Sequence, residues 1–356
     1  MAKKTILSVK DLNVKFNLRG KILHAIRDVS IDVYKGESLA IVGESGCGKS
    51  VLNKNFIGML DVNGFVESGE ILYFGLNGTE APGQAVDLAK FKKERDWLKI
   101  RGKEICMILQ DPMTSLNPLK TIGSQIAEAI RLHQNLKGAE LKKAVIKTLE
   151  DVGIEDAKRR CRQYPHEFSG GMRQRVVIAI AIACKPKILI CDEPTTALDV
   201  TIQAQILGLL KELKSKLDLT IIFITHDLGV VANIADRVAV MYAGEFVEIG
   251  MCEEVFYDPR HPYTWALLSS LPQLGVKGKE LYSIKGAPPN LFKHIEGDAF
   301  AVRNPKALKI DFIEKPPFFD ITPTHKARTW LLDKRAPKVE PPEYIRNIRC
   351  GKEKRG

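Results

Sequence analysis

Runs of apolar residues alternate with segments of helical apolar spacing through the middle of the chain. Four apolar runs are short enough to be buried strands, at residues 38–42, 105–109, 188–194 and 220–225. Apolar positions between them recur every three or four residues, which predicts helices at residues 50–60, 121–132, 141–152, 176–184 and 200–217. This alternation predicts an α/β fold in which helices cover a mostly parallel sheet.

The flanks of that region favour antiparallel pairing. β-Branched residues alternate in residues 6–16 and 22–33, and residues 237–250 predict a hairpin that turns at Ala243-Gly244. Prolines recur after residue 251 and the periodicity fades. We therefore expect a main domain at residues 1–250 and a less regular extension at residues 251–356.

Composition places the chain among ordinary globular proteins, with 356 residues, 45% hydrophobic and 27% charged. Its apolar runs are far shorter than the roughly 20 residues of a membrane helix, and its N-terminal segment has no apolar core of a secretion signal. Seven scattered cysteines without metal-type pairing favour a reducing compartment. We expect a cytoplasmic protein whose net charge of +11 suits an anionic membrane surface, nucleic acid or an acidic partner, or an ordinary solvated surface.

One motif indicates a ligand class. Residues 43–50 read Gly-Glu-Ser-Gly-Cys-Gly-Lys-Ser and fit the phosphate-loop pattern G-x-x-x-x-G-K-[ST]. Glycines let backbone N–H groups wrap a polyphosphate, Lys49 brings a positive charge to the β and γ phosphates, and Ser50 offers a hydroxyl to Mg²⁺. The loop lies between a predicted strand and a predicted helix, whose N-terminus also favours an anion.

Three further predicted strands end in polar side chains. Gln110 follows residues 105–109, Asp192 and Glu193 follow the apolar run from residue 188, and His226 follows residues 220–225. Ligands bind at the carboxyl ends of strands in open α/β sheets. Asp192 therefore suits the Mg²⁺ of a bound nucleotide, and Glu193 is left for the attacking water.

Two more segments precede predicted helices. Ser169, Gly170, Gly171 and Met172 come before an apolar helix and present N–H groups and a hydroxyl to an anion. Asp199 lies in the loop before residues 200–217.

In order, these clusters resemble the phosphate loop, Q-loop, signature, Walker B, D-loop and switch histidine of ABC-type ATPases, over roughly residues 5–250. The resemblance implies a P-loop ABC domain with a RecA-like parallel core, an antiparallel β-subdomain and a helical subdomain at about residues 111–180. It also implies that ATP lies between the phosphate loop of one cassette and the signature of another, so that the chain works as half of a pair.

The resemblance further implies a role for each site residue. The ATP-binding residues are Phe16, which would stack on adenine, and Gly43, Glu44, Ser45, Gly46, Cys47, Gly48, Lys49, Ser50 and Val51. The Mg²⁺ ligands are Ser50, Gln110 and Asp192. The catalytic residues are Glu193, which polarises water, His226 at the γ-phosphate, Gln110 and Lys49. Ser169, Gly170, Gly171 and Met172 serve the partner's nucleotide, and Asp199 belongs to the D-loop.

The extension narrows the resemblance. His261-Pro262-Tyr263-Thr264 and Gly286-Ala287-Pro288-Pro289 are similar to the C-terminal extension of oligopeptide and dipeptide permease ATPases of the D type. This implies ATP hydrolysis coupled to oligopeptide uptake on the cytoplasmic face of the cell membrane. The implied partners are a second ABC ATPase subunit of the F type, two transmembrane permease subunits and an extracellular peptide-binding protein, without direct contact to nucleic acid.

The chain departs from this family at one point. Many members carry four cysteines in the extension that resemble an iron–sulfur site, whereas this chain has Asp298, Asn304, Asp311 and Thr329. Thiolate ligation is impossible there, so we expect no cluster. We expect the two aspartates to be solvated rather than to hold a divalent ion.

Two alternatives remain open. A soluble cassette ATPase that acts on nucleic acid or ribosomes fits the positive charge, but residues 51–168 lack a long heptad region and the chain has one cassette. A regulatory cassette that binds ATP without turnover is disfavoured because every catalytic position is filled. Met172 stands where many cassettes have Gln.

Overall fold

The computed structural model describes residues 3–76, 85–196, 198–270, 284–343 and 345–346, whose strands form two sheets. The smaller sheet is antiparallel, in the order β2 (Lys21–Tyr34), β1 (Thr5–Leu18), β4 (Gly64–Tyr73) and β5 (Val86–Asp87). The larger sheet has the order β11 (Phe319–Asp320), β12 (Lys326–Ala327), β10 (Glu245–Met251), β9 (Arg237–Tyr242), β3 (Ser38–Val42), β8 (Thr220–Thr225), β7 (Ile188–Asp192) and β6 (Ile105–Ile108).

The larger sheet is parallel at one end and antiparallel at the other. β6, β7, β8, β3 and β9 run parallel, and β10, β12 and β11 pair antiparallel beyond them. The predicted α/β fold and the antiparallel pairing of the first two strands are confirmed. So is the hairpin, since β9 and β10 turn at Ala243 and Gly244, both with positive φ.

Helices connect the parallel strands. The α-helices are α1 (Lys49–Phe56), α2 (Glu94–Trp97), α3 (Pro112–Ser115), α4 (Ile122–Gln134), α5 (Gly138–Asp151), α6 (Ala157–Arg160), α7 (Gly170–Ile182), α8 (Val200–Leu217), α9 (Leu228–Ile234), α10 (Cys252–Tyr257) and α11 (Pro262–Ser269). The short 3₁₀ helices are η2 (Leu88–Lys90), η3 (Pro165–Glu167), η5 (Ala301–Arg303), η6 (Lys309–Phe312) and η7 (Trp330–Leu332).

Two helix boundaries differ from the sequence prediction by four residues or more, and the others differ by at most three. The first helix ends at Phe56 rather than at residue 60, and Gly58 follows it with a positive φ of 61°. The helix expected at residues 176–184 begins at Gly170, because the Ser169 hydroxyl accepts a hydrogen bond from the backbone of Met172 and caps it there. The glycines of this segment therefore lie inside the helix.

Three hydrophobic cores explain why the sheet residues are apolar on both faces. Ile222 and Ile224 of β8 face α1 and the smaller sheet. Ile221 and Phe223, which alternate with these two along the strand, face α7 and α8. A third core joins β3 and β9 to α9, α10 and α11. Burial of each such side chain contributes about 1.5–3 kcal/mol, so the strands are held on both sides.

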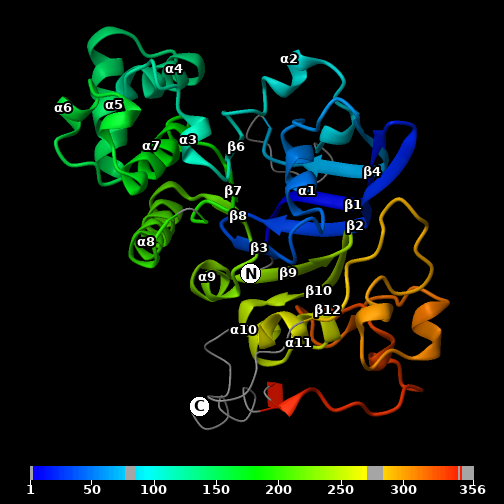
Figure 1. Ribbon diagram of the computed structural model, residues 1–356. Coiled ribbons are helices and arrows are strands. Elements are labelled where there is room, and N and C mark those ends of the chain that lie inside the picture. Colours follow the sequence, from blue (N-terminus) through cyan, green and yellow to red (C-terminus); the bar gives the residue numbers. More distant parts are fainter. Residues whose placement is uncertain (1–2, 77–84, 197, 271–283, 344, 347–356) are drawn as a thin grey trace.

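Figure 1 shows how these cores divide the molecule. Helix α1 lies between the two sheets. Helices α3 to α7, which follow β6 and precede β7 along the chain, form a helical group of their own. Residues after 251 pack against the β10 edge of the larger sheet, to which they add β12 and β11. Among the described residues, no helix combines the length and apolar character that a bilayer span requires.

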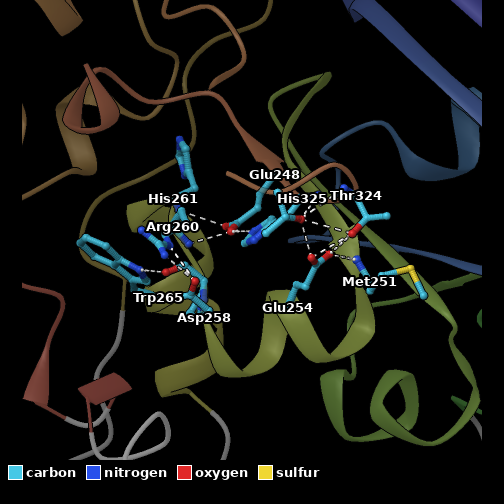
Figure 2. A network of polar contacts seen from close by, with 11 residues as sticks. Glu248, Met251, Glu254, Asp258, Arg260, His261, Trp265, Thr324 and His325 are labelled. Carbon is cyan, nitrogen blue, oxygen red and sulfur yellow. Dashed lines mark hydrogen bonds and ion pairs between the residues drawn. The ribbon is translucent and has the colours of Figure 1, made fainter. Parts of the chain in front are cut away.

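A buried polar network joins the extension to this edge (Figure 2). The Glu248 carboxylate of β10 is fully buried and lies 2.8 Å from Nε2 of His325, in the turn before β12. It also accepts hydrogen bonds from the backbone N–H groups of Arg260 and His261. Glu254 of α10 accepts hydrogen bonds from Thr324 and from the Met251 backbone. One buried carboxylate thus fixes two separate segments of the extension.

His261 adds a constraint on the protonation state of this network. Its Nδ1 accepts a hydrogen bond from the backbone of Tyr263 and caps α11, so this nitrogen carries no proton. Complete burial lowers the pKa of His261 to about 3. The ring is therefore neutral at physiological pH, as the cap requires.

We expect Glu248→Ala to lower the free energy of unfolding by about 3–5 kcal/mol, because it leaves a buried histidine and two buried amides without their acceptor. Chemical denaturation of the purified chain measures this. Glu212→Ala, which removes an exposed carboxylate paired with Lys216, serves as the control and should lower the free energy of unfolding far less, because solvent screens this pair. Equal losses in the two variants would contradict the structural role of the network.

Candidate nucleotide site

The phosphate loop connects β3 to α1 and is shaped by its glycines. Gly48 has a φ of 108°, which side-chain-bearing residues rarely adopt, and it stands directly before the helix. A Cβ on Gly43 would lie 2.1 Å from the Met241 carbonyl oxygen. The loop therefore packs against β9 too closely for any larger residue at position 43.

Lys49 lies at the start of α1 with its side chain folded back over the loop. Its Nζ donates hydrogen bonds to the carbonyl oxygens of Gly43, at 2.7 Å, and Glu44, at 2.9 Å, and the residue is 5% exposed. The ammonium group is thus held at the centre of the loop, among groups that a polyphosphate would contact.

Ser50 of α1 lies next to Asp192, the last residue of β7. The Ser50 hydroxyl donates to Oδ1 of Asp192 at 3.1 Å. Burial raises the pKa of Asp192, while the hydrogen bond from Ser50 and the charge of Lys49 oppose that shift. The carboxylate and the hydroxyl together offer oxygen ligands, which hard divalent cations such as Mg²⁺ prefer.

Glu193 is the most constrained side chain of the site. Its Oε2 accepts hydrogen bonds from Nε2 of Gln110, at 2.9 Å, and from the Thr196 hydroxyl, at 3.1 Å, and its Oε1 lies 2.9 Å from Nδ1 of His226. Its backbone has a φ of 46°, and its N–H donates to the Ile224 carbonyl. A left-handed glutamate directly after a strand costs about 1–3 kcal/mol and is held by the surrounding structure.

A cavity of about 420 Å³ opens beside these groups. It is lined by Phe16, Leu18, Leu23, Ala25, Ser45, Gly46, Gly48, Lys49, Ser50, Val51, Asp61, Asn63, Gln110, Glu193 and Leu291. Gly43, Glu44 and Cys47 of the loop do not line it, and Phe16 is 8% exposed with its ring against Gly64. The cavity thus has a polar end at the loop and an apolar end at β1 and β2.

The signature segment, Ser169 to Met172, does not line this cavity. It opens α7 in the helical group (Figure 1), and Ser169 and Gly170 are exposed. A Cβ on Gly171 would lie 2.7 Å from Ile202 of α8, the helix that Asp199 caps. The starts of α7 and α8 therefore lie side by side, outside the lining of the cavity.

Comparisons with known proteins agree with this geometry. The family model described as ABC transporter matches residues 26–196, and the model of the oligopeptide/dipeptide transporter C-terminal region matches residues 247–310. The oligopeptide transport ATP-binding protein AmiE of Streptococcus pneumoniae is 58% identical over 97% of this chain and 95% of its own length. OppD of Bacillus subtilis is 54% identical, over 96% of this chain and 93% of that protein.

The chain belongs to the ABC transporter family. Among solved structures, cbiO1 from Clostridium perfringens matches with a TM-score of 0.60 and 31% identity, over 72% of this chain and 92% of cbiO1. The ATP-binding cassette MJ0796, in a dimeric post-hydrolysis state bound to ADP and Pi, matches with a TM-score of 0.59 and 25% identity, over 69% of this chain and 98% of that one. The predicted ABC-type fold and the resemblance to oligopeptide permease ATPases are confirmed.

Residues 298, 304, 311 and 329 of the extension offer no thiolate to an iron–sulfur cluster. The side-chain oxygens of Asp298, Asn304, Asp311 and Thr329 accept hydrogen bonds from the backbone N–H groups of Phe300, Lys306, Leu308 and Leu331. Each side chain thus closes a local turn. The expectation that the two aspartates are solvated is wrong, because both are buried.

Burial keeps a proton on Asp298 over much of the pH range. It raises the pKa of Asp298 to about 7 and also raises the pKa of Asp311. Iron–sulfur clusters are held by thiolates, whereas these four positions carry carboxyl, amide and hydroxyl groups. Groups of three or more His, Cys, Asp or Glu that could hold a metal ion are absent from the described residues.

We expect purified chain, prepared without oxygen, to contain far less than one iron per molecule and to lack visible absorbance from sulfide-bound iron. The reason is that no thiolate stands at the four positions. Elemental analysis together with an absorbance spectrum measures both. Near-stoichiometric iron and acid-labile sulfide would contradict the expectation.

Proposed function

We propose that this chain is the ATP-binding and ATP-hydrolysing subunit of an ABC importer and couples hydrolysis to oligopeptide uptake. It works on the cytoplasmic face of the cell membrane with a second ABC ATPase subunit of the F type, two transmembrane permease subunits and an extracellular peptide-binding protein. The match over residues 247–310 to the oligopeptide/dipeptide transporter C-terminal region supports the choice of cargo class.

The observation that carries the proposal is the fixed position of Glu193. Its carboxylate is held by Gln110 and His226 and lines the same cavity as the phosphate loop. A carboxylate in this place removes a proton from a water that attacks the γ-phosphate. A structural ion pair on the surface would not need a left-handed backbone or the additional hydrogen bonds from Gln110 and Thr196.

The remaining residues bind and orient the nucleotide. Lys49 exchanges the carbonyl oxygens of Gly43 and Glu44 for phosphate oxygens, and the N–H groups at the start of α1 complete the cradle. The apolar end of the cavity, which includes Phe16, takes the base. His226 donates a hydrogen bond to the γ-phosphate. Gln110 senses whether the γ-phosphate is bound and couples this to the position of the helical group.

Ser50 and Asp192, whose oxygens are 3.1 Å apart, would hold Mg²⁺, and Gln110 would be a further ligand. When bound, Mg²⁺ neutralises charge on the phosphate oxygens. Ser50 and Asp192 hold and orient it, and the buried position of Asp192 strengthens this interaction by excluding water.

The signature segment serves the nucleotide of the partner cassette. Ser169 and Gly170 are exposed, and the N-terminus of the 13-residue helix α7 attracts phosphate. Asp199 lies on the same surface because α7 and α8 begin side by side. ATP then closes the pair of cassettes, and hydrolysis opens it and moves the permease subunits.

We expect Glu193→Gln to leave MgATP binding within about threefold of wild type and to lower ATP turnover about 10²–10⁴-fold, because the amide cannot accept the proton of water. The measurement uses the transporter assembled in lipid vesicles, with and without peptide. Glu212→Gln on the exposed face of α8 is the control and should retain peptide-stimulated turnover.

Three outcomes separate the alternatives. Wild-type turnover in Glu193→Gln would remove the assignment of Glu193 as base. Binding of ATP without turnover by the assembled wild-type complex would favour the regulatory cassette. Turnover stimulated by polynucleotide rather than by peptide would favour the cassette that acts on nucleic acid.

A further inference from the structure

The C-terminal extension contacts the phosphate loop directly, although more than 200 residues separate them in the sequence. Arg303 of η5 binds Glu44 of the loop through both arms of its guanidinium. Nη1 lies 2.7 Å from Oε2 and Nη2 lies 3.1 Å from Oε1. The Arg303 side chain is 5% exposed and the Glu44 side chain 27%, so the guanidinium is shielded from water and the carboxylate is partly shielded. Shielded bidentate pairs of this kind fix geometry as well as charge.

Arg303 itself donates hydrogen bonds to three other residues in two parts of the molecule. It donates to the Tyr242 hydroxyl at the end of β9, at 3.2 Å, and to the carbonyl oxygens of Ile284 and Lys285 in the extension. The hydrogen bonds that Arg303 donates to these partners restrict the position of its guanidinium. Arg303 therefore transmits the position of the extension and of β9 to Glu44.

Every polar group of Glu44 is held. Its N–H donates to the hydroxyl of Tyr263, a fully buried residue of α11, at 2.8 Å. Its carbonyl oxygen accepts a hydrogen bond from Lys49, and its carboxylate is bound by Arg303. Two of these three contacts come from residues after position 251. The loop conformation that directs Lys49 is thus set partly by the extension.

A second contact reaches the apolar end of the cavity. The carbonyl oxygen of Leu291 accepts a hydrogen bond from the backbone N–H of His24 in β2, at 3.0 Å. Figure 1 shows this yellow-orange part of the chain rising beside β2. The Leu291 side chain lines the cavity together with Phe16 and Leu23. The extension therefore supplies one wall where the base is expected to lie.

We propose that the extension is part of the nucleotide site. Arg303 is a positioning residue that acts through Glu44 on the phosphate loop, and Leu291 contacts the base side of the nucleotide. This inference rests on the proposed function, since it takes the cavity at Lys49 to be the ATP site. It goes beyond that function by assigning the extension a role in nucleotide affinity, in addition to any role in contacts with other subunits.

The test measures dissociation constants of the purified full-length chain for MgATP and for magnesium tripolyphosphate, by displacement of a fluorescent ATP analogue. Arg303→Ala is expected to weaken both ligands about tenfold, because one charge-assisted contact to the loop is lost. Leu291→Ala is expected to weaken ATP about three- to tenfold and tripolyphosphate less than twofold, because only ATP carries a base.

The matched control is Arg335→Ala. Arg335 also forms a bidentate pair in the extension, with Asp333, but its side chain is 82% exposed and away from the cavity lining. We expect unchanged affinity for both ligands. Melting temperatures are recorded for every variant, so that lost stability is separated from lost affinity in the folded chain.

A double-mutant cycle shows whether Arg303 acts through Glu44. If it does, Arg303→Ala combined with Glu44→Gln binds ATP no more weakly than Arg303→Ala alone. Additive losses would contradict the positioning role. A lower melting temperature with wild-type affinity in Arg303→Ala would overturn the proposal and leave a purely structural contact.

Failure of the proposed function gives a different result. If the wild-type chain binds neither MgATP nor tripolyphosphate, the cavity is not a nucleotide site. If wild type binds both and the Arg303 and Leu291 variants bind equally well, the nucleotide site stands and the extension is not part of it.

Discussion

The candidate site depends on one constraint of the fold, the parallel alignment of β3, β7 and β8. Their carboxyl ends reach the same edge of the sheet, and each passes into a turn that carries polar side chains. This brings Ser50 to Asp192 and Glu193 to His226, although the residues of the first pair are 142 positions apart. Apolar residues on both faces of these strands hold the alignment, because a shift by one residue would exchange the faces.

Burial and hydrogen bonding then act differently on Asp192 and Glu193. Burial raises the pKa of Asp192, so a cation beside Ser50 would stabilise its charged form. Glu193 is held by Gln110, Thr196 and His226, while its own backbone is in the left-handed region. Two neighbouring carboxylates therefore stand in different surroundings, as a metal ligand and a base require.

The fold and the proximity of the site residues could be predicted because both follow from local patterns. Apolar runs predicted the strands, and glycine with lysine and serine predicted the loop before α1. Leu291, Arg303 and Tyr263 could not be predicted, since their contacts with the loop and β2 depend on how distant segments pack.

The errors have equally specific causes. Asp298 and Asp311 were expected in solvent because carboxylates are rarely buried, but each oxygen that closes a turn removes part of the cost of burial. The start of α7 was placed six residues late, because the apolar pattern begins at Val176 while the cap is Ser169. A helix starts where its N–H groups find an acceptor, and apolar periodicity does not report that position.

The central claim is that the loop at Lys49 holds the phosphates of ATP. Titration calorimetry of MgATP into the wild-type chain and into Lys49→Met tests it most directly, with circular dichroism to verify that both are folded. The account predicts saturable binding to wild type with one nucleotide per chain and at least a tenfold loss in Lys49→Met. Equal affinity in the two folded proteins would contradict it.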